Sequence, residues 1–467
     1  MINNDPQKEV SSYRDNYGSV YYLGDKVLRA VNFPGENNYN ILKKQNIYSD
    51  SIKNKFLINF KEIDRKNFPE VLKEKNILLE TEKLPFISYP YEWTFNQLKD
   101  AALHHLNFQI FLLKNNCVLR DASAFNIQFI KGKPIFIDIL SLKKYEDGEY
   151  WIGYKQFCEN FLNPLLLGHL KNIHHNDLFR GSIDGLQTIT LNKLLSLKNK
   201  VSFNVFIHVV LQSRLLKQDI KNPLSTIKKK KKLNKFKIKS YFFLLNQLKT
   251  WIEKLEFSKE TSTWESYEKN NTYNDKSLYE KEKIIEKFVI KYKPKKLLDL
   301  GCNNGAFSRI ALNNGAQHVV GIDYDFNAVS NSYDIAKKNN LNFLPLFMNL
   351  SDPSPNQGWN QNERKGLIER FKCDAIVALA LEHHLIIGKN IPISEFIKWI
   401  INFGKIGLLE FVPKNDHTIS HMLSTKEDIY EDYTEENFEK KLLEHVEIIN
   451  KHKLYNSNRI IYEYKSL

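Results

Sequence analysis

The chain has 467 residues, a formal net charge of +14, 42% hydrophobic residues and four cysteines. This length exceeds what one ordinary hydrophobic core accommodates, so we expect two or three folded domains. The sequence has no apolar run long enough to span a membrane, and its first residues lack the pattern of a signal peptide. The cysteines have neither metal-binding nor disulfide-framework spacing. We therefore expect a cytoplasmic protein.

Most of the lysines alternate with glutamates, as on a solvated surface. Enrichment in Lys, Asn and Ile is typical of an AT-rich genome, so the charge by itself does not favour nucleic acid as a partner. The exception is the run Lys228–Lys232. We expect this run to lie in a connection between domains. The alternative is a peripheral contact with anionic lipid or with a polyanionic glycan.

The first half begins with a predicted hairpin over Ser19–Val31, in which two β-rich runs flank the turn dipeptide Gly24-Asp25. Apolar runs follow at Ile77–Glu80 and Phe86–Tyr91. The segment Gln97–Leu113 has the apolar spacing of a helix. The first half is therefore predicted to be a mixed α+β domain.

Acidic and amide residues then follow at defined spacing. Asp121 and Asn126 are separated by four residues, and a predicted hairpin over Phe129–Phe136 leads to Asp138. This order resembles the catalytic region of protein-kinase-like and small-molecule-kinase-like domains. The resemblance implies that Asp121 orients an attacking hydroxyl and that Asn126 and Asp138 hold the magnesium ion of Mg-ATP. It also implies that Tyr89–Trp93 is the hinge between two lobes.

The resemblance is incomplete, because the sequence lacks a glycine-rich phosphate loop and an evident Val-Ala-Ile-Lys lysine, for which Lys26 or Arg29 could substitute. Asp and Asn are also common in loops for reasons of turn geometry. Residues 1–220 are therefore predicted to be a kinase-like domain, which either binds Mg-ATP or is degenerate. A degenerate domain would recognise the substrate or scaffold the rest of the chain.

Residues 221–275 are predicted to be a basic and helical linker. Tyr241–Leu255 carries apolar residues at helical spacing, and a second helix near Leu278–Lys291 leads into the next strand. The aromatic residues Trp264, Tyr267 and Tyr273 lie between these two helices.

The most informative segment is Lys296–Ser308, followed by Val319–Asp323. A short apolar run ends in Gly301 and Gly305 and opens onto a helix, and a second apolar run ends in an acid. The glycines allow a ligand to approach the backbone closely, and Asp323 can accept hydrogen bonds from both hydroxyls of a ribose. The Gly-x-x-x-Gly spacing differs from that of a dinucleotide loop, which aims a helix N-terminus at a pyrophosphate.

Three further apolar runs, Phe343–Asn349, Asp374–Leu385 and Gly407–Pro413, continue the pattern of alternating strands and helices. Residues 276–467 thereby resemble the class I S-adenosylmethionine-dependent methyltransferases. The resemblance implies a doubly wound, Rossmann-like α/β domain in which the strand ends meet at one ligand-binding edge.

The resemblance also implies which residues bind S-adenosylmethionine, and it requires no metal in this domain. The cofactor-binding residues that it indicates are Asp299, Gly301, Asn303, Gly305, Asp323, Tyr324, Asn349 and Leu381, with Trp264 and Tyr267 as a lid. Asn349 stands where the family has an aspartate. The aromatic residues of the lid have an alternative role, which is to pack the seam between the domains.

Methyl transfer requires alignment of the acceptor with the donor and, for a hydroxyl or amine acceptor, removal of a proton. His383 and His384 follow the fourth strand, and an imidazole that titrates near neutrality suits this task. Glu410, at the end of the fifth strand, is a further catalytic candidate. Either histidine could instead cap a helix or fill the core.

A kinase-like half before a methyltransferase half resembles the layout of bacterial methyltransferases of surface-polysaccharide and nodulation clusters. This resemblance implies O-methylation of a carbohydrate or similar small polar acceptor. The alternatives are a bifunctional kinase-methyltransferase, an RNA or protein methyltransferase whose first half recognises the substrate, and a non-catalytic cofactor-binding protein.

Overall fold

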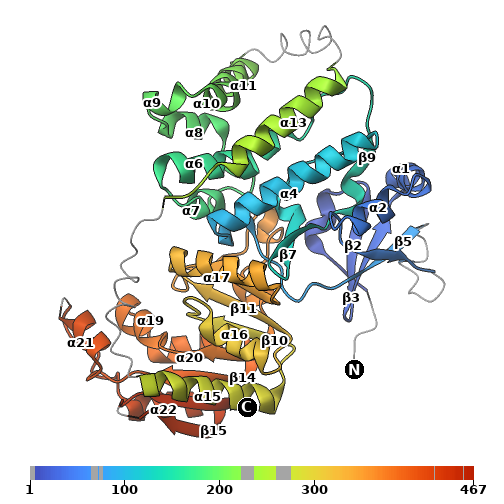
Figure 1. Ribbon diagram of the computed structural model, residues 1–467. Helices are drawn as coiled ribbons and strands as arrows, with labels where there is room; N and C mark the ends of the chain where they lie inside the picture. Colours follow the sequence, from blue (N-terminus) through green and yellow to red (C-terminus); the bar gives the residue numbers. More distant parts are fainter. Residues whose placement is uncertain are drawn as a thin grey trace.

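The computed structural model describes residues 6–64, 72, 77–221, 236–258, 275–424, 426–455 and 457–467. The first half begins with an antiparallel sheet in the order β1-β2-β3-β5-β4 (Figure 1). Its strands and the two helices that follow β3 are β1 (Gln7–Lys8), β2 (Gly18–Leu23), β3 (Lys26–Val31), α1 (Phe33–Lys44), α2 (Ile47–Lys53), β4 (Phe60–Glu62) and β5 (Ile77–Glu82). The predicted hairpin at Gly24-Asp25 is confirmed, since Leu23 pairs with Lys26 across a two-residue turn.

The rest of the first half is mainly helical. Helix α4 (Phe95–Lys114) begins at a capping box in which Thr94 and Gln97 exchange side-chain and backbone hydrogen bonds, and this confirms the predicted helix. Two small antiparallel sheets of two strands follow, formed by β6 (Cys117–Leu119) with β9 (Leu142–Lys144) and by the hairpin of β7 (Ile127–Ile130) with β8 (Lys133–Phe136). The remaining helices are α5 (Tyr154–Phe157), α6 (Asn163–Lys171), α7 (Asn176–Arg180), α8 (Thr188–Leu194), α9 (Leu197–Lys200), α10 (Phe203–Val205), α11 (Gln212–Lys221) and α13 (Ile238–Glu253).

Helix α13 lies in the predicted linker, but it packs along α4 as part of the helical layer of the first half (Figure 1). The Gln109 side chain in α4 donates a hydrogen bond of 2.8 Å to the Tyr241 hydroxyl in α13, and both residues are buried. The buried side of α13 carries Leu245, Leu248 and Ile252, as the helical spacing predicts.

The C-terminal half is a doubly wound α/β domain, as predicted. Its sheet has the order β12-β11-β10-β13-β14-β16-β15, in which β10 to β14 are parallel and β16 is antiparallel to both neighbours. Helices cover both faces of the sheet (Figure 1). Its elements are α15 (Asp275–Tyr292), β10 (Lys296–Leu300), α16 (Ala306–Asn313), β11 (His318–Asp323), α17 (Phe326–Asn339), β12 (Phe343–Phe347), α18 (Leu367–Arg370), β13 (Cys373–Ala378), α19 (Glu382–Lys389), α20 (Ile393–Ile401), β14 (Gly404–Phe411), α21 (His417–Leu423), α22 (Glu435–Leu443), β15 (Val446–Lys453) and β16 (Ile460–Ser466).

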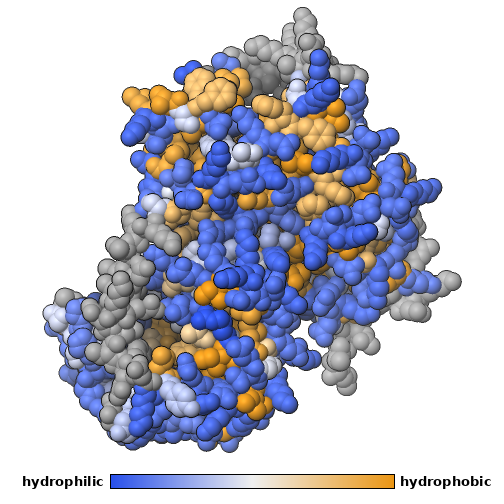
Figure 2. Space-filling view, viewed as in Figure 1, coloured by the Kyte–Doolittle hydropathy of each residue, from blue (hydrophilic) through white to orange (hydrophobic). Residues whose placement is uncertain are grey.

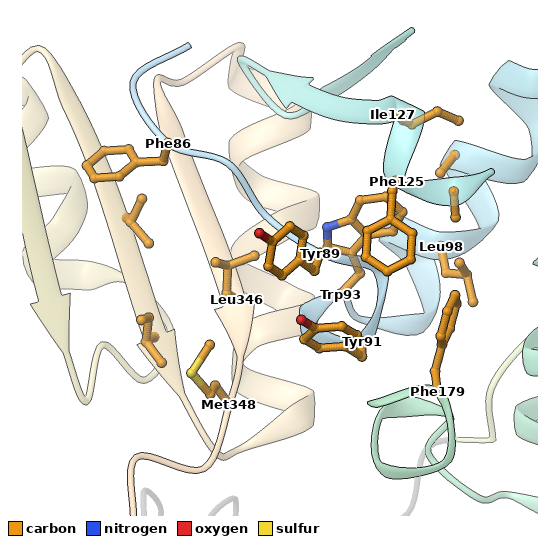
Figure 3. Close-up of a cluster of buried hydrophobic side chains, with 14 of the residues drawn as sticks. Phe86, Tyr89, Tyr91, Trp93, Leu98, Phe125, Ile127, Phe179, Leu346 and Met348 are labelled. Carbon is orange, nitrogen blue, oxygen red and sulfur yellow. The ribbon is translucent and has the colours of Figure 1, made fainter. Parts of the chain in front are cut away.

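The two halves share one hydrophobic core. The segment that joins β5 to α4 carries Tyr89 and Tyr91, and these rings lie between Phe125 of the first half and Leu346 and Met348 at the end of β12 (Figure 3). All five side chains are buried. The β12 edge of the C-terminal sheet is therefore covered by the first half rather than exposed to solvent.

A buried ion pair crosses the same interface. The carboxylate of Glu92 forms a two-pronged ion pair with the guanidinium of Arg370, and the Ser354 hydroxyl donates a hydrogen bond of 2.7 Å to it. The Arg370 side chain also stacks over the Tyr89 ring at 4.0 Å. Because both charges have left water, this pair depends on both halves keeping their relative position.

The long connection between β12 and β13 also contacts the first half. The Tyr13 hydroxyl donates to Glu363 at 2.7 Å, and Arg180 donates to the Asp352 carboxylate at 2.8 Å. Elsewhere on the interface, the predicted turn at Lys131-Gly132 lies against the C-terminal part of α17, which precedes β12. Within the described ranges, none of the helices is both long and apolar enough to cross a bilayer.

Candidate functional site

The loop between β10 and α16 has a backbone that few residue types tolerate. Gly301, Asn303 and Gly305 have φ values of +78°, +44° and +70°. These are left-handed conformations, which glycine adopts freely and which asparagine tolerates better than most residues. A Cβ atom on Gly305 would lie 2.5 Å from the Phe343 ring. The predicted glycine motif is therefore a geometric requirement of this loop.

Asp323 at the end of β11 closes the loop from the neighbouring strand. One carboxylate oxygen accepts the backbone N–H of Asn303 and the other accepts that of Asp325, each at 2.8 Å. Burial raises the pKa of Asp323 despite these two hydrogen bonds. A carboxylate has about four lone-pair sites, so two backbone donors leave capacity for the hydroxyls of a ribose.

Asp299 lies beneath the loop and not at its surface. The side chain is only 2% exposed, and the Ser308 hydroxyl of α16 donates a hydrogen bond of 2.6 Å to it. Burial, the largest cause, raises the pKa of Asp299 to about 7, and the hydrogen bond from Ser308 opposes this shift. Asp299 therefore anchors the start of α16, which carries the predicted cofactor loop.

The other predicted cofactor residues line the same carboxyl edge of the sheet. Leu381 at the start of α19 packs beside Gly301, since a Cβ atom on that glycine would lie 3.5 Å from the leucine. The Tyr324 ring is 62% exposed and stacks on Phe347 with ring centroids 5.3 Å apart. Asn349 forms a local turn by accepting the backbone N–H of Ser351 at 3.0 Å.

The histidine pair occupies the first turn of α19, directly after β13. The ring centroids of His383 and His384 are 4.2 Å apart; His383 is fully buried and His384 is half-buried. Burial lowers the pKa of His384 to about 3, with further contributions from His383 and Arg459. His384 is consequently neutral at physiological pH, but it is a much weaker base than the imidazole titrating near neutrality that was expected at this position.

Glu410 is fully buried at the end of β14, where it is paired with two cations. Its carboxylate lies 2.7 Å from the ammonium of Lys281 in α15 and 3.7 Å from the guanidinium of Arg459, the residue directly before β16. Arg459 also forms two hydrogen bonds with Asp416, at 2.7 and 3.0 Å. These contacts favour a role for Glu410 as an anchor of α15 on the sheet edge; its catalytic role stays a prediction.

Two comparisons with the sequences of known proteins agree with a methyltransferase site at this edge. The family model of FtsJ-like methyltransferases matches residues 273–378. Nodulation protein NoeA of Rhizobium meliloti (strain 1021) is 36% identical over 464 residues, which cover 98% of this chain and 96% of that protein. The chain belongs to the NoeA family. It is an S-adenosylmethionine-dependent methyltransferase.

Solved structures of low similarity were also found. Magnesium protoporphyrin IX methyltransferase from Synechocystis PCC 6803, with bound SAH, is 15% identical and has a TM-score of 0.30, covering 41% of this chain and 84% of its own. N-methyltransferase NodS from Bradyrhizobium japonicum WM9 is 12% identical with a TM-score of 0.29, covering 41% of this chain and 98% of its own.

The residues at the sheet edge of this NoeA relative fit the implied cofactor, S-adenosylmethionine. The loop at Gly301–Gly305 brings the backbone to the edge without bulky side chains, and the Asp323 carboxylate retains acceptor capacity. Trp264 and Tyr267, which were predicted to form a lid, lie outside the described residues, as do Tyr273 and Lys228–Lys232.

Sequence reasoning missed two buried residues that organise this edge. Glu382 accepts the backbone N–H of Val412 at 2.7 Å and the Tyr433 hydroxyl at 3.0 Å, and so ties α19 to the end of β14. Lys281 is 1% exposed although it is charged. Lys281 lies four residues before the buried Ile285, and this spacing places both on the apolar side of α15. The burial of Lys281 could have been predicted from this spacing.

In the first half of this methyltransferase, Asp121, Asn126 and Asp138 do lie in one region. The Asp121 carboxylate accepts hydrogen bonds from the Asn126 amide at 3.0 Å and the Ser141 hydroxyl at 2.6 Å. Asp138 lies 3.5 Å from the guanidinium of Arg29 on β3. Burial raises the pKa of Asp121, and it raises that of Asp138 to about 6 although Arg29 opposes the shift.

The predicted hinge has its backbone groups occupied by neighbouring side chains. The carbonyl oxygens of Tyr91 and Trp93 accept hydrogen bonds from the Asn176 amide at 2.9 and 3.0 Å, and the Pro90 carbonyl lies 3.1 Å from the His175 ring. Among the described residues, no three His, Cys, Asp or Glu side chains cluster so as to hold a metal ion.

Proposed function

We propose that this methyltransferase transfers a methyl group to a hydroxyl of a carbohydrate or another small polar acceptor. The observation that carries the proposal is the half-buried His384, whose imidazole is held neutral beside the cofactor edge. S-adenosylmethionine would supply an electrophilic methyl group, whose bond to the sulfonium sulfur would break and leave S-adenosylhomocysteine. An acceptor oxygen loses its proton as it forms the new bond to carbon, and His384 would receive that proton on a ring nitrogen.

A weakly basic imidazole is adequate for this role. An alcohol oxygen becomes strongly acidic as it gains a third bond, so even a base of low pKa can take the proton late in the reaction. Close packing between His383 and His384 fixes the orientation of the accepting ring, and the Arg459–Asp416 pair adds polar groups on the same side. The relative is named a nodulation protein, and the carbohydrate acceptor is proposed from the resemblance of the chain's layout to methyltransferases of nodulation clusters.

The test is methyl-donor turnover with a panel of mono- and oligosaccharide acceptors, followed by NMR identification of the methylated atom. We expect His384→Gln to lower turnover by about 10²–10⁴-fold, with unchanged affinity for S-adenosylhomocysteine. His318→Gln is the matched control, because His318 also has a pKa lowered by burial but begins β11 at the opposite edge. Full turnover by both His383→Gln and His384→Gln would place the base elsewhere, and an N-methylated product would refute the hydroxyl acceptor.

We also propose that the first half has a kinase-like fold and serves the methyltransferase as a fixed recognition or scaffold module. The occupied backbone of Tyr89–Trp93 and the shared core with β12 support this role over ATP turnover. The juxtaposition of Asp121, Asn126 and Asp138 keeps the bifunctional alternative open to test.

Calorimetric titration of the full-length protein with each ligand distinguishes the scaffold proposal from the bifunctional alternative. We expect S-adenosylhomocysteine to bind and Mg-ATP not to bind. If Mg-ATP binds and Asp138→Ala abolishes that binding alone, the bifunctional alternative replaces the scaffold proposal.

A further inference from the structure

The net charge of the chain is confined to one stretch. Residues 185–252 contain 15 of the 68 lysines and arginines but only one of the 54 acidic residues, Asp219. Subtracting them leaves 53 cations and 53 acids in the remaining 399 residues, so this stretch accounts for the whole net charge of +14. Scattered lysines of genomic origin would not produce this distribution, and a localised partner is therefore indicated.

The described part of this stretch folds into helices that expose apolar side chains. Leu197 at the start of α9 and Val201 directly after its end are each 82% exposed, and Phe203 in α10 and Phe243 in α13 are 69% and 70% exposed. Figure 2 shows hydrophobic side chains gathered over α9 and α10 and along α13. The Gln247 amide of α13 donates to Asn204 of α10 at 3.4 Å, so the helices form one continuous surface. We call it the α9–α13 face.

Exposed cations flank these apolar residues. Lys193 and Lys198 lie beside Leu197 in the sequence, and Lys237 and Lys239 lie at the start of α13. The described residues 188–218 and 236–252 contain no aspartate or glutamate, and Glu253, at the C-terminal end of α13, pairs with Lys249 rather than with these lysines. The face therefore combines protruding apolar side chains with uncompensated positive charge, which is the pattern of surfaces that lie at a membrane interface.

We propose that the α9–α13 face docks on the surface of an anionic lipid bilayer. The lysines would approach the lipid phosphates, and the protruding Leu197, Val201, Phe203 and Phe243 would enter the boundary between headgroups and acyl chains. The face lies at the end of the molecule away from the C-terminal sheet, so docking leaves the methyltransferase half facing away from the lipid (Figure 1).

Two other occupants fit less well. A second copy of this chain, related by a two-fold axis, would bring the same positive surface against itself, which repulsion disfavours. A nucleic acid would find the lysines, but its phosphates and bases gain little from aliphatic side chains such as Leu197 and Val201, which would remain in water. An anionic bilayer would contact the lysines through its phosphates and the protruding apolar side chains through its acyl chains.

The test is co-sedimentation of the full-length protein with vesicles of phosphatidylcholine, with and without phosphatidylglycerol. We expect binding only to the anionic vesicles, and weaker binding as salt is raised. The quadruple variant Lys193→Gln, Lys198→Gln, Lys237→Gln, Lys239→Gln should bind them at least about tenfold more weakly. The control with the same charge change is Lys44→Gln, Lys53→Gln, Lys338→Gln, Lys440→Gln, which alters exposed lysines on other elements and should bind normally.

The apolar contribution has its own variant. Leu197→Ser with Val201→Ser should weaken binding several-fold at constant charge, whereas Phe33→Ser with Ile429→Ser, at positions 85% and 62% exposed elsewhere, should not. The high exposure of these positions means that the variants will fold. Failure of the native protein to bind anionic vesicles overturns the proposal. Equal binding of the vesicles by the test variants and their control variants also overturns it. A preference for homopolymer RNA that is unchanged in the Leu197→Ser, Val201→Ser variant would indicate a nucleic acid instead, and a dimer that dissociates in this variant would indicate a second copy of the chain.

Discussion

The cofactor edge of the C-terminal sheet and the Asp121–Asp138 region of the first half both place carboxyl groups where strands meet loops, but they satisfy these groups differently. At the cofactor edge the backbone provides the contacts, since Asp323 accepts two main-chain N–H groups and keeps free acceptor capacity. In the first half, side chains provide most of them: Asn126 and Ser141 bond Asp121, and Arg29 pairs with Asp138, which also accepts the backbone N–H of Leu140 at 3.3 Å.

This difference has a consequence for ligands. A carboxylate that is held by the backbone of a rigid loop is oriented before the ligand arrives, so binding requires little reorganisation. Side chains that bond one another must exchange those partners for a ligand, and each exchange lowers the net gain. The comparison thus favours cofactor binding at the first site and a structural role at the second.

The largest loss of stability should come from breaking the buried ion pair between Glu92 and Arg370, which joins the two halves of the chain. Arg370→Ala leaves the buried Glu92 carboxylate without its cation, and we expect a loss of about 3–5 kcal/mol in the free energy of unfolding. Urea unfolding followed by fluorescence measures this loss. The exposed pair between Lys398 and Glu395 offers a control, since Lys398→Ala should cost less than about 1 kcal/mol. Equal effects would mean that the halves do not depend on the buried pair.

The individual strands and helices near both sites could be predicted from the sequence because their signals are local. Short apolar runs that end in glycine or an acid marked β10 and β11, and the Gly24-Asp25 turn marked the β2–β3 hairpin. The charge network around Glu410 could not be predicted. Lys281 lies 129 residues before Glu410 in the chain, and only the fold brings the two side chains together.

The covering of β12 by the first half could not be predicted either. Tyr89, Tyr91 and Trp93 form an apolar segment whose sequence fits a hinge between lobes as well as an interface. The burial of Tyr89 and Tyr91 against Leu346 and Met348 depends on contacts between segments more than 200 residues apart. Sequence periodicity reports which residues are apolar and not which surface they meet.

A second prediction compares two glycines with similar backbone conformations. Gly305→Ala combines left-handed strain with a clash against Phe343, and we expect it to lower stability by about 2–5 kcal/mol and to weaken S-adenosylhomocysteine binding. Gly24, in the β2–β3 turn, has a φ of +58° with open space around its missing Cβ. Gly24→Ala should therefore cost only about 1–2 kcal/mol and leave cofactor binding intact.

Thermal unfolding and calorimetry test both variants. Equal losses of stability would show that backbone strain alone, and not the close approach of Phe343, makes Gly305 necessary. Normal cofactor affinity in a folded Gly305→Ala protein would show that the loop does not form the binding surface.

A third prediction concerns pH, and it follows from the pKa of Asp299, which burial raises to about 7. In the unfolded chain this group titrates near pH 4, so between pH 4 and 7 the folded state holds a proton that the unfolded state has lost. Stability from this group is therefore full below pH 4 and falls as pH rises toward 7. Between pH 5 and 8 the loss is roughly 2–3 kcal/mol.

Urea titrations at pH 5 and pH 8 measure this effect. Asp299→Asn should remove most of that pH dependence, because the amide does not titrate. Asp138→Asn, in the first half, should remove only roughly 1 kcal/mol, since the pKa of Asp138 is raised to about 6. A wild-type protein that is as stable at pH 8 as at pH 5, with Asp299→Asn unchanged in its profile, would contradict the assignment.

The smallest effects distinguish the two regions most directly, because each contains a buried serine whose hydroxyl bonds an aspartate. The hydroxyls of Ser308 and Ser141 donate hydrogen bonds of 2.6 Å to Asp299 and Asp121. We expect Ser308→Ala and Ser141→Ala each to lower stability by about 1–2 kcal/mol. Only Ser308→Ala should weaken S-adenosylhomocysteine binding, because Ser308 secures the helix that carries the cofactor loop. If calorimetry finds the same weakening in Ser141→Ala, the shared core transmits changes between the regions, and they act as one site rather than two.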